Sequence, residues 1–212
     1  MRFDDAVRRL AVLPEPLPAP AAILMPTIVG GLERRPPRMP PPGRPGRPAA
    51  VLVLLYPDDQ GLARVVLTER SSRDGHHSGE VSFPGGKSEP EDTDLVATAV
   101  REAAEEIALD AVAVGLRVVG ILDPFWIPVS DFAVTPVVAI AERRPILAAS
   151  PAEVARIVEP PIARFLPDAP IEIVERTIGD WPLRYGAYEV DGLTVWGATA
   201  RILSQLGAVL AG

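Results

Sequence analysis

Three glutamates, Glu102, Glu105 and Glu106, crowd the short stretch REAAEEIAL. If this stretch is helical, the spacings i, i+3 and i+4 place the three carboxylates on one face. Like charges at these spacings cost roughly 0.2 to 0.5 kcal/mol per pair, and the negative end of the helix dipole adds a comparable penalty. A solvated acidic face is the ordinary interpretation of such a run. Clustered carboxylates on a rigid element also suit magnesium, which commonly binds together with substrate phosphates, and a cation would turn the repulsion into affinity.

A glycine-rich segment lies directly before this helix. Gly85 and Gly86 follow Phe83 and Pro84 at the end of the strand-like sequence EVSFPGGK. An ordinary strand-to-helix loop explains one glycine, but it explains two less easily. We therefore expect the glycine pair to form a loop that turns tightly beside the carboxylates and contacts the substrate.

Cationic side chains upstream are candidate contacts to substrate phosphates. Arg70 and Arg73 offer paired guanidinium donors. His77 is a further candidate, although simple surface exposure explains it equally well. His76 and His77 are the only histidines, and without a third nitrogen or sulfur ligand they make a poor zinc site. A P-loop is excluded, because Val81 stands where G-x-x-x-x-G-K-[ST] requires its first glycine.

The sequence GGKSEPEDTDLVATAVREAAEEIAL resembles the Nudix box, G-x5-E-x7-R-E-U-x-E-E-x-G-U, in which U is bulky and apolar. The matching positions are Gly86, Arg101, Glu102, Ala103, Glu105, Glu106 and Leu109. Three positions depart from the pattern. The early acidic residue is Asp92, with one residue more before Arg101, Ala108 stands at the late glycine, and Ala103 is a small version of U. None of these changes removes a carboxylate from the cluster.

The longer spacing resembles one branch of this family, the coenzyme A pyrophosphatases. That branch carries L-L-T-x-R-[S/A]-x3-R-x3-G-x3-F-P-G-G before the box, and this chain reads VLTERSSRDGHHSGEVSFPGG. The second arginine of the pattern is absent, because Gly75 stands at its position and Arg73 lies two residues earlier. The sequences VTPVVA and LTVWGATARIL also resemble the branch, so the similarity runs from about residue 50 to the C-terminus.

The resemblance implies a Nudix α/β/α sandwich with a mixed β-sheet. It also implies hydrolysis of the pyrophosphate bond of coenzyme A or acyl-coenzyme A, which yields 3',5'-ADP and (acyl-)4'-phosphopantetheine. Magnesium, with manganese as an alternative, would bind to Glu102, Glu105 and Glu106, neutralise the diphosphate and activate water. Arg101 would orient the carboxylates or pair with Asp92, and Glu105 is our candidate for the general base. A homodimer is compatible with the resemblance.

Two other functions stay open at this point. One is a Nudix hydrolase of another nucleoside diphosphate derivative, such as ADP-ribose or a dinucleotide, and the departure at Gly75 keeps this alternative. The other is a Nudix-fold module that binds such a ligand without cleaving it. The intact glutamates argue against the second, because a mere binder has little reason to keep a costly acidic face.

Composition limits the remaining classes. The chain has 212 residues, a net charge of -7 and no cysteine. The acidic balance argues against nucleic-acid binding, and we expect neither a signal peptide nor a membrane-spanning segment. We therefore expect a soluble cytoplasmic protein whose partner is a small nucleotide. The 25 prolines concentrate before Ala49, which predicts a short helix and a proline-rich arm over residues 1–48 and the catalytic domain over residues 49–212. The arm is interpreted as a strap or linker, with recognition by a proline-binding domain as the alternative.

The rest of the sequence alternates between strand and helix patterns. A helix is expected over residues 94–109, with Asp92 or Thr93 as its cap. Its apolar positions toward the core are Leu95, Ala99, Ala103 and Ile107. Segments of strand character are AAVLVLLY, ARVVLTE, EVSFPGGK, VGLRVVGIL, FAVTPVVAIA, IEIVERTI and YEVDGLTVW, and GATARILSQLGAVL closes the chain as an amphipathic helix. This order predicts helices on both faces of a sheet.

Two tryptophans need separate interpretation. Trp126, in DPFWIPVSDF, could stack on an adenine base, but an aromatic side chain between strands more often packs in the fold. Trp196 belongs to the closing segment and is expected in the core.

Overall fold

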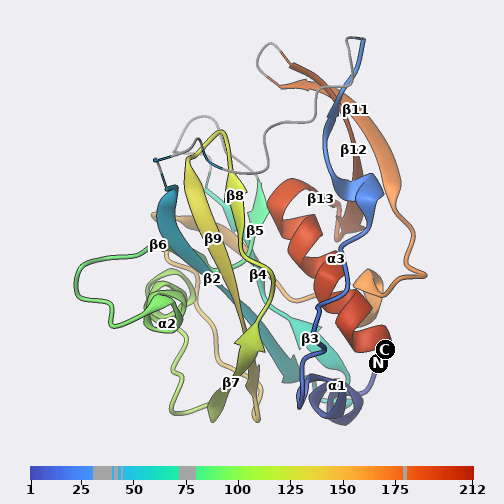
Figure 1. Ribbon diagram of the computed structural model, residues 1–212. Coiled ribbons are helices and arrows are strands. Elements are labelled where there is room, and N and C mark those ends of the chain that lie inside the picture. Colours follow the sequence, from blue (N-terminus) through green and yellow to red (C-terminus); the bar gives the residue numbers. More distant parts are fainter. Residues whose placement is uncertain (31–39, 41–42, 44, 72–79, 179–180) are drawn as a thin grey trace.

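A mixed sheet of six strands forms the centre of the molecule (Figure 1). The computed structural model describes residues 1–30, 40, 43, 45–71, 80–178 and 181–212. β2 and β9 lie side by side and run parallel, while β3 and β6 pair with β2, and β7 and β8 with β9, all antiparallel. The strand bounds are β2 (Arg47–Pro57), β3 (Ala63–Val65), β6 (Gly85–Lys87), β7 (Leu116–Ile121), β8 (Phe125–Ile127) and β9 (Phe132–Ala141).

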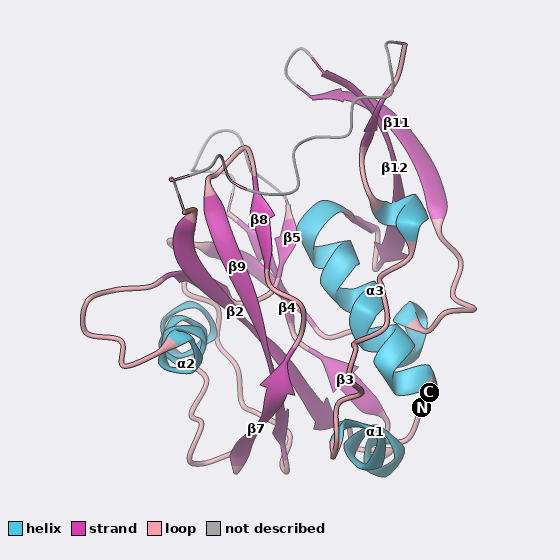
Figure 2. Ribbon diagram, viewed as in Figure 1, coloured by secondary structure: helices cyan, strands magenta, loops and turns pink. Residues whose placement is uncertain are grey.

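The sequence of β2 explains why this sheet lies between two helical layers. Side chains of a strand point alternately to its two faces, and β2 is apolar at both sets of positions. Leu52 and Leu54 pack in one core with α2 (Leu95–Ile107). Val53 and Leu55 pack in the second core, which also contains residues of α1 (Phe3–Leu10) and α3 (Gly197–Ala211). Figure 2 shows the helices on opposite sides of the sheet. The predicted α/β/α sandwich with a mixed sheet is confirmed.

Two smaller sheets flank the central one. One has the strand order β10-β4-β5, and the other has the order β1-β12-β11 with β13 paired to β12. Their bounds are β1 (Thr27–Ile28), β4 (Leu67–Arg70), β5 (Val81–Ser82), β10 (Val154–Val158), β11 (Glu172–Ile178), β12 (Trp181–Val190) and β13 (Leu193–Val195). β11 and β12 form a hairpin that projects beyond the central sheet (Figure 1).

Two predicted elements differ in detail from the structure. The sequence ARVVLTE, predicted as one strand, forms β3 and β4, because at Val66 the chain passes from the central sheet to a smaller one. The cap of α2 is Asp94, whose side chain accepts a hydrogen bond from the Ala97 amide at 2.8 Å, and not Asp92 or Thr93. The Asp92 carboxylate is instead engaged by other side chains, described below. Strands β1, β8 and β10 lie outside the predicted set.

The N-terminal segment packs on the helical layer formed by α1 and α3. Three side chains of α1, one per turn, and Leu24 of the short 3-10 helix η1 (Ala22–Leu24) are buried in the same core as α3. Gln205 of α3 donates to the Pro18 carbonyl at 3.0 Å, and the Ala21 amide donates to the Ser204 hydroxyl at 2.9 Å. Residues 1–30 therefore pack against the fold, and β2 begins two residues before the expected boundary. Most of the proline-rich run RRPPRMPPPGRPGRP lies outside the described residues. No helix in the described ranges is long and apolar enough to cross a membrane.

Candidate active site

The glycine pair lies in a strand and not in the predicted loop. Gly85 and Gly86 belong to β6, which pairs with the beginning of β2 at Val51 and Ala50. Gly85 has φ +155, and a Cβ at this position would lie 2.4 Å from the Ala50 carbonyl oxygen. Only glycine allows this backbone to approach β2 so closely. The approach brings β6 directly beside α2.

Two of the three glutamates converge on this glycine pair. The Gly85 amide donates to Glu106 Oε2 at 3.2 Å. A Cβ at position 86 would lie 2.6 Å from Glu102 Oε1, so the missing side chain of Gly86 makes room for this carboxylate. The buried face of α2 is the predicted one, since Ala99, Ala103 and Ile107 are fully buried. β6 therefore presents the backbone of Gly85 and Gly86, and α2 presents the carboxylates of Glu102 and Glu106, to the same small space.

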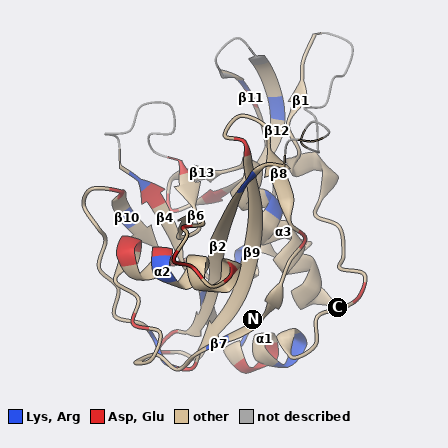
Figure 3. Ribbon diagram, turned by 60° about the vertical axis from the view of Figure 1, so that its left-hand side comes forward, with Lys and Arg blue, Asp and Glu red and all other residues tan. Residues whose placement is uncertain are grey.

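Arg101 holds the acidic side chains around it in fixed directions. Its Nε and Nη2 donate to the two oxygens of Asp92 at 2.9 and 3.1 Å, and Nη2 also donates to the Lys87 carbonyl at 3.1 Å. Its Nη1 lies 3.1 Å from both Glu102 Oε1 and Glu105 Oε2. Basic and acidic positions stand side by side on α2 in Figure 3. The predicted pairing of Arg101 with Asp92 is confirmed, and the Arg101 guanidinium holds the pKa of the Asp92 carboxyl well below its usual range.

Glu106 carries the largest electrostatic cost in the site. Its exposed fraction is 5%, and burial raises the pKa of its carboxyl to about 7. The charges of Glu102 and Glu153 raise this pKa further, while the Gly85 amide and the Arg70 guanidinium lower it. Burial also raises the pKa of Glu102. Two buried carboxylates that repel each other are suited to bind a divalent cation, because its charge would offset both their desolvation and their mutual repulsion.

Glu105 has a different environment from the other two glutamates. Its side chain is 58% exposed and is held by the ion pair with Arg101. Within the described residues, no three acidic or imidazole side chains lie close enough together to form a metal site as they stand. The three-glutamate site therefore stays a prediction, and so does the role of Glu105 as general base.

A fourth carboxylate, Glu153, was missed by the sequence reasoning. The Ser71 amide donates to the Glu153 carbonyl at 2.9 Å, and the Ser71 hydroxyl donates to the Ala152 carbonyl at 2.9 Å. Glu153 ends a turn over residues 151–153. This turn is also fixed to α2, because the Ser150 amide donates to the Glu106 carbonyl at 2.8 Å. The charge of Glu153 raises the pKa of both Glu102 and Glu106. No local pattern in ASPAEV indicates this position, because the pairing of β10 with β4 creates it.

The remaining predicted contacts divide into described and undescribed residues. Arg70 ends β4, opposite Val154 of β10, and its charge acts on Glu106. Arg73 and His77 lie outside the described residues, as does Gly75. These two predictions therefore stay untested by the structure.

The tryptophans have packing partners in the fold. Trp126 donates to Asp131 Oδ1 at 3.0 Å and lies against Gly46, where a Cβ would be 2.6 Å from the indole ring. Trp196 stacks on Tyr185 with ring centroids 4.6 Å apart and is half-buried. The contacts of Trp126 agree with a packing role, whereas Trp196 packs at the edge of the fold and not in the core as expected.

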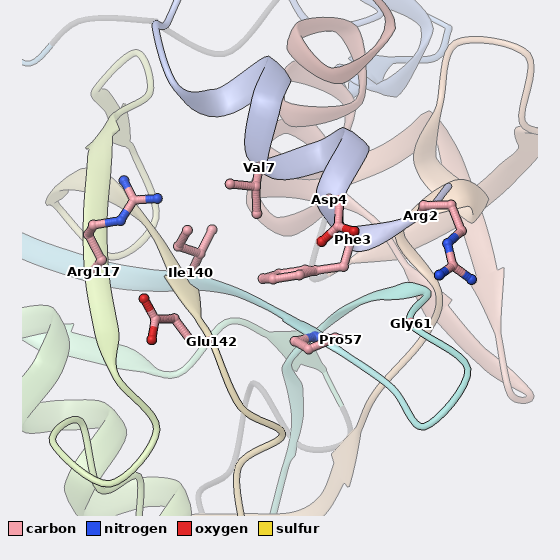
Figure 4. Close-up of a pocket in the computed structure, with 9 residues that line it drawn as sticks. All are labelled: Arg2, Phe3, Asp4, Val7, Pro57, Gly61, Arg117, Ile140 and Glu142. Carbon is pink, nitrogen blue, oxygen red and sulfur yellow. The ribbon is translucent and has the colours of Figure 1, made fainter.

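A separate cavity of about 300 Å³ lies at the other end of β2 from the glycine pair. Figure 4 shows its lining, with Phe3 and Val7 of α1 directed toward Ile140, and with Arg117 and Glu142 along one side. Its charged residues have both signs, and Arg2 is directed to the Gln60 carbonyl at 2.7 Å. This cavity shares no residue with the carboxylate site on α2.

Comparisons with known proteins agree with the geometry. The sequence model of the NUDIX domain matches residues 46–158. Nudix hydrolase 22, chloroplastic, and Nudix hydrolase 15, mitochondrial, both from Arabidopsis thaliana, are each 40% identical over 76% of this chain, which spans only 55% and 58% of their lengths. The Nudix hydrolase NudL of Citrobacter koseri is 38% identical over 76% of this chain and 81% of its own length. The crystal structure of a Nudix hydrolase from M. smegmatis, RenU, aligns with a TM-score of 0.54 and 22% identity over 78% of this chain and 86% of that chain, which supports the fold.

Proposed function

The chain belongs to the Nudix family, and from this premise we propose that it is a magnesium-dependent hydrolase of the pyrophosphate bond in coenzyme A or acyl-coenzyme A. The products are 3',5'-ADP and (acyl-)4'-phosphopantetheine. One observation carries the proposal: Glu102 and Glu106 converge on the Gly85–Gly86 backbone, with the Arg70 guanidinium near enough to lower the pKa of Glu106. Acidic ligands for a cation and a cationic contact for phosphate are thus adjacent.

Glu102 and Glu106 are the first ligands for the cation, with Glu105 as the third. Both Glu102 and Glu106 are anchored on a helix and packed against β6, so their positions are set before a cation arrives. Bound magnesium, or manganese, supplies positive charge that neutralises the diphosphate oxygens and lowers the pKa of coordinated water. The buried position of Glu106 makes this site sensitive to the charge of that single side chain.

Arg101 has a positioning role and does not bind substrate. A guanidinium has five N–H donors. Asp92 and the Lys87 carbonyl engage Nε and Nη2, and the carboxylates of Glu102 and Glu105 engage Nη1. Its hydrogen-bonding capacity is therefore used within the protein. Arg70, at the end of β4, is the described arginine that we assign to a substrate phosphate, because guanidinium groups recognise phosphate oxygens with paired donors.

The proton acceptor has two candidates. Glu105 is exposed on the outer side of the cluster, where Arg101 orients it. Glu153 lies on the turn that Ser71 and Ser150 fix beside the same carboxylates. A general base must reach the attacking water, and the side chains of Glu105 and Glu153 are both exposed. We keep Glu105 as the assigned base, with Glu153 as the competing assignment.

The assignment to coenzyme A rests on the resemblance of VLTERSSRDGHHSGEVSFPGG to the coenzyme A branch. The experiment that tests it is parallel hydrolysis of coenzyme A, ADP-ribose and a dinucleoside polyphosphate, with and without magnesium, with the products resolved by chromatography. We expect 3',5'-ADP from coenzyme A and little product from the other two. Cleavage of the others instead would assign the protein to another Nudix substrate, and tight binding without turnover would identify a binding module.

A further inference from the structure

The outer edge of the β11–β12 hairpin is unusual among the edges of this fold. β11 pairs with β12 through seven residue pairs without a register shift, and no other described strand pairs with β11. The other edge strands described are either two or three residues long or, for β7 and β10, interrupted by a register shift. Short edges and bulges prevent a sheet from pairing with another chain. β11 lacks both of these protections, and its sequence EIVERTI contains neither proline nor lysine. Its charged side chains, Glu172, Glu175 and Arg176, have both signs, so a partner with matching charges can still pair with it.

An apolar patch adjoins this edge on one face of the hairpin. Ile173 is 44% exposed and lies opposite Gly186 of β12, so the two residues share a face. A Cβ at Gly186 would lie 2.7 Å from Ile171 Cγ2 and 2.9 Å from the Ile23 carbonyl oxygen, and the Ile23 side chain is 52% exposed. Exposed isoleucines beside an unpaired strand edge supply the apolar contacts that a strand-pairing partner would cover.

The charges of β11 select a second copy of the chain as the partner. Two identical strands that pair antiparallel about a two-fold axis place one residue opposite itself. If that residue is Val174, each Glu172 lies opposite Arg176 of the partner subunit, so that two opposite-charge pairs form and no like charges face each other. If it is Glu175 or Arg176, a charge lies opposite its own copy, which is unfavourable. With Ile173 at the centre, neither acidic residue meets an arginine.

We propose that β11 pairs with β11 of a second copy across a two-fold axis at Val174, which joins the two hairpin sheets into one continuous sheet in a homodimer. In this register Ile173 and Ile173 of the partner subunit become diagonal neighbours on the face that carries the apolar patch. Glu175, which stands opposite the partner's Ile173, keeps its own charge partner, because its Oε1 lies 3.7 Å from Arg184 Nε within the same hairpin. The unpaired edge of β11, the exposed isoleucines and the spacing of Glu172 and Arg176 thus favour the same antiparallel pairing centred on Val174.

A charge-exchange experiment on the full chain tests both the dimer and its register. Molar mass is measured by light scattering and by sedimentation over a concentration series. We expect the native chain to form a dimer, twice the 22.6 kDa of one chain. Glu172→Arg and Arg176→Glu each turn both cross-strand pairs repulsive and should weaken the dimer by about tenfold or more. The double variant Glu172→Arg/Arg176→Glu restores opposite charges and should restore dimerisation.

The control is Glu189→Arg, an exposed glutamate on β12 that does not lie on the edge. It changes the net charge as Glu172→Arg does, and we expect it to leave the dimer intact. A native chain that stays monomeric at every concentration overturns the proposal. So does a dimer that survives both single exchanges, or one that the double variant fails to restore, because either result places the interface or its register elsewhere. None of these readouts depends on hydrolase activity.

Discussion

Gly86 and Glu102 fit together so closely that a single carbon atom would separate them. A Cβ at Gly86 would lie 2.6 Å from Glu102 Oε1, and the neighbouring Gly85 donates its amide to Glu106. The glycine pair therefore defines the space in which the two carboxylates of α2 stand. Its role is steric and electrostatic at once.

The two glycines should respond differently to alanine. Gly86→Ala meets the flexible end of the Glu102 side chain, so we expect a folded protein in which this carboxylate is displaced and magnesium-dependent turnover falls about tenfold or more. Gly85→Ala meets the Ala50 carbonyl and the Val51 backbone at φ +155, so we expect loss of roughly 2 kcal/mol or more of stability. Urea unfolding and steady-state kinetics on both variants separate the effects. Equal stability losses would show that Gly86 is purely structural.

Ala108 ends α2 in the left-handed region, with φ 54, at the position where the Nudix box has glycine. A Cβ in this conformation costs roughly 1 kcal/mol. Ala108→Gly should therefore raise the free energy of unfolding by about 0.5 to 1 kcal/mol with unchanged activity. The matched control is Ala104→Gly, an exposed position inside the same helix, which should lower it by a similar amount. A destabilised Ala108→Gly variant would contradict the assignment of strain to this cap.

The buried Glu106 predicts a specific pH dependence of stability in the presence of a chelator. Its pKa rises from an ordinary value of 4.5 to about 7 in the folded protein, so the folded state holds a proton that the unfolded state has lost between these pH values. The free energy of unfolding should therefore decrease as pH rises through this window, by roughly 3 kcal/mol from this group. Denaturant unfolding from pH 4 to 8 measures the change.

The variant Glu106→Gln removes this titration and should flatten the profile between about pH 5 and 7. Glu102 keeps a smaller slope of the same sign, because burial raises its pKa as well. Glu91→Gln, an exposed glutamate before α2, is the control and should leave the slope unchanged. Magnesium should stabilise the native protein most at high pH, where both carboxylates are ionised. A profile that is identical in Glu106→Gln and the native chain would contradict the desolvated state of Glu106.

Arg70 should contribute to substrate binding more than to metal binding. Arg70→Ala removes a charged hydrogen-bond donor worth roughly 1.5 to 3 kcal/mol, which corresponds to an increase of about 10- to 100-fold in KM. The magnesium concentration for half-maximal rate should change little. Arg156→Ala, on the neighbouring strand β10 and paired with Glu69 at 3.1 Å, controls for loss of a positive charge. An unchanged KM for Arg70→Ala would remove its phosphate role.

Local patterns predicted the parts of this site that lie on one element. The apolar spacing predicted the buried face of α2, and the family resemblance implied that Arg101 orients the carboxylates or pairs with Asp92. Two features depend on contacts between elements and escaped the sequence reasoning. The glycine pair is a strand because β2 lies beside it, and Glu153 reaches the site because β10 pairs with β4. The cap was misplaced by one or two residues, because the helix begins at Leu95 and Asp94 is the residue directly before it.

The most direct test of the carboxylate site is the rate of coenzyme A hydrolysis as a function of magnesium concentration, for the native chain, Glu106→Gln and the control Glu91→Gln. Glu106→Gln removes one ligand charge at nearly constant volume, so the fold should persist, as circular dichroism can verify. We predict no turnover without magnesium and a loss of about a hundredfold or more for Glu106→Gln at limiting magnesium, with a normal rate for Glu91→Gln. Near-normal turnover by Glu106→Gln at limiting magnesium would contradict the assignment of this residue as a metal ligand.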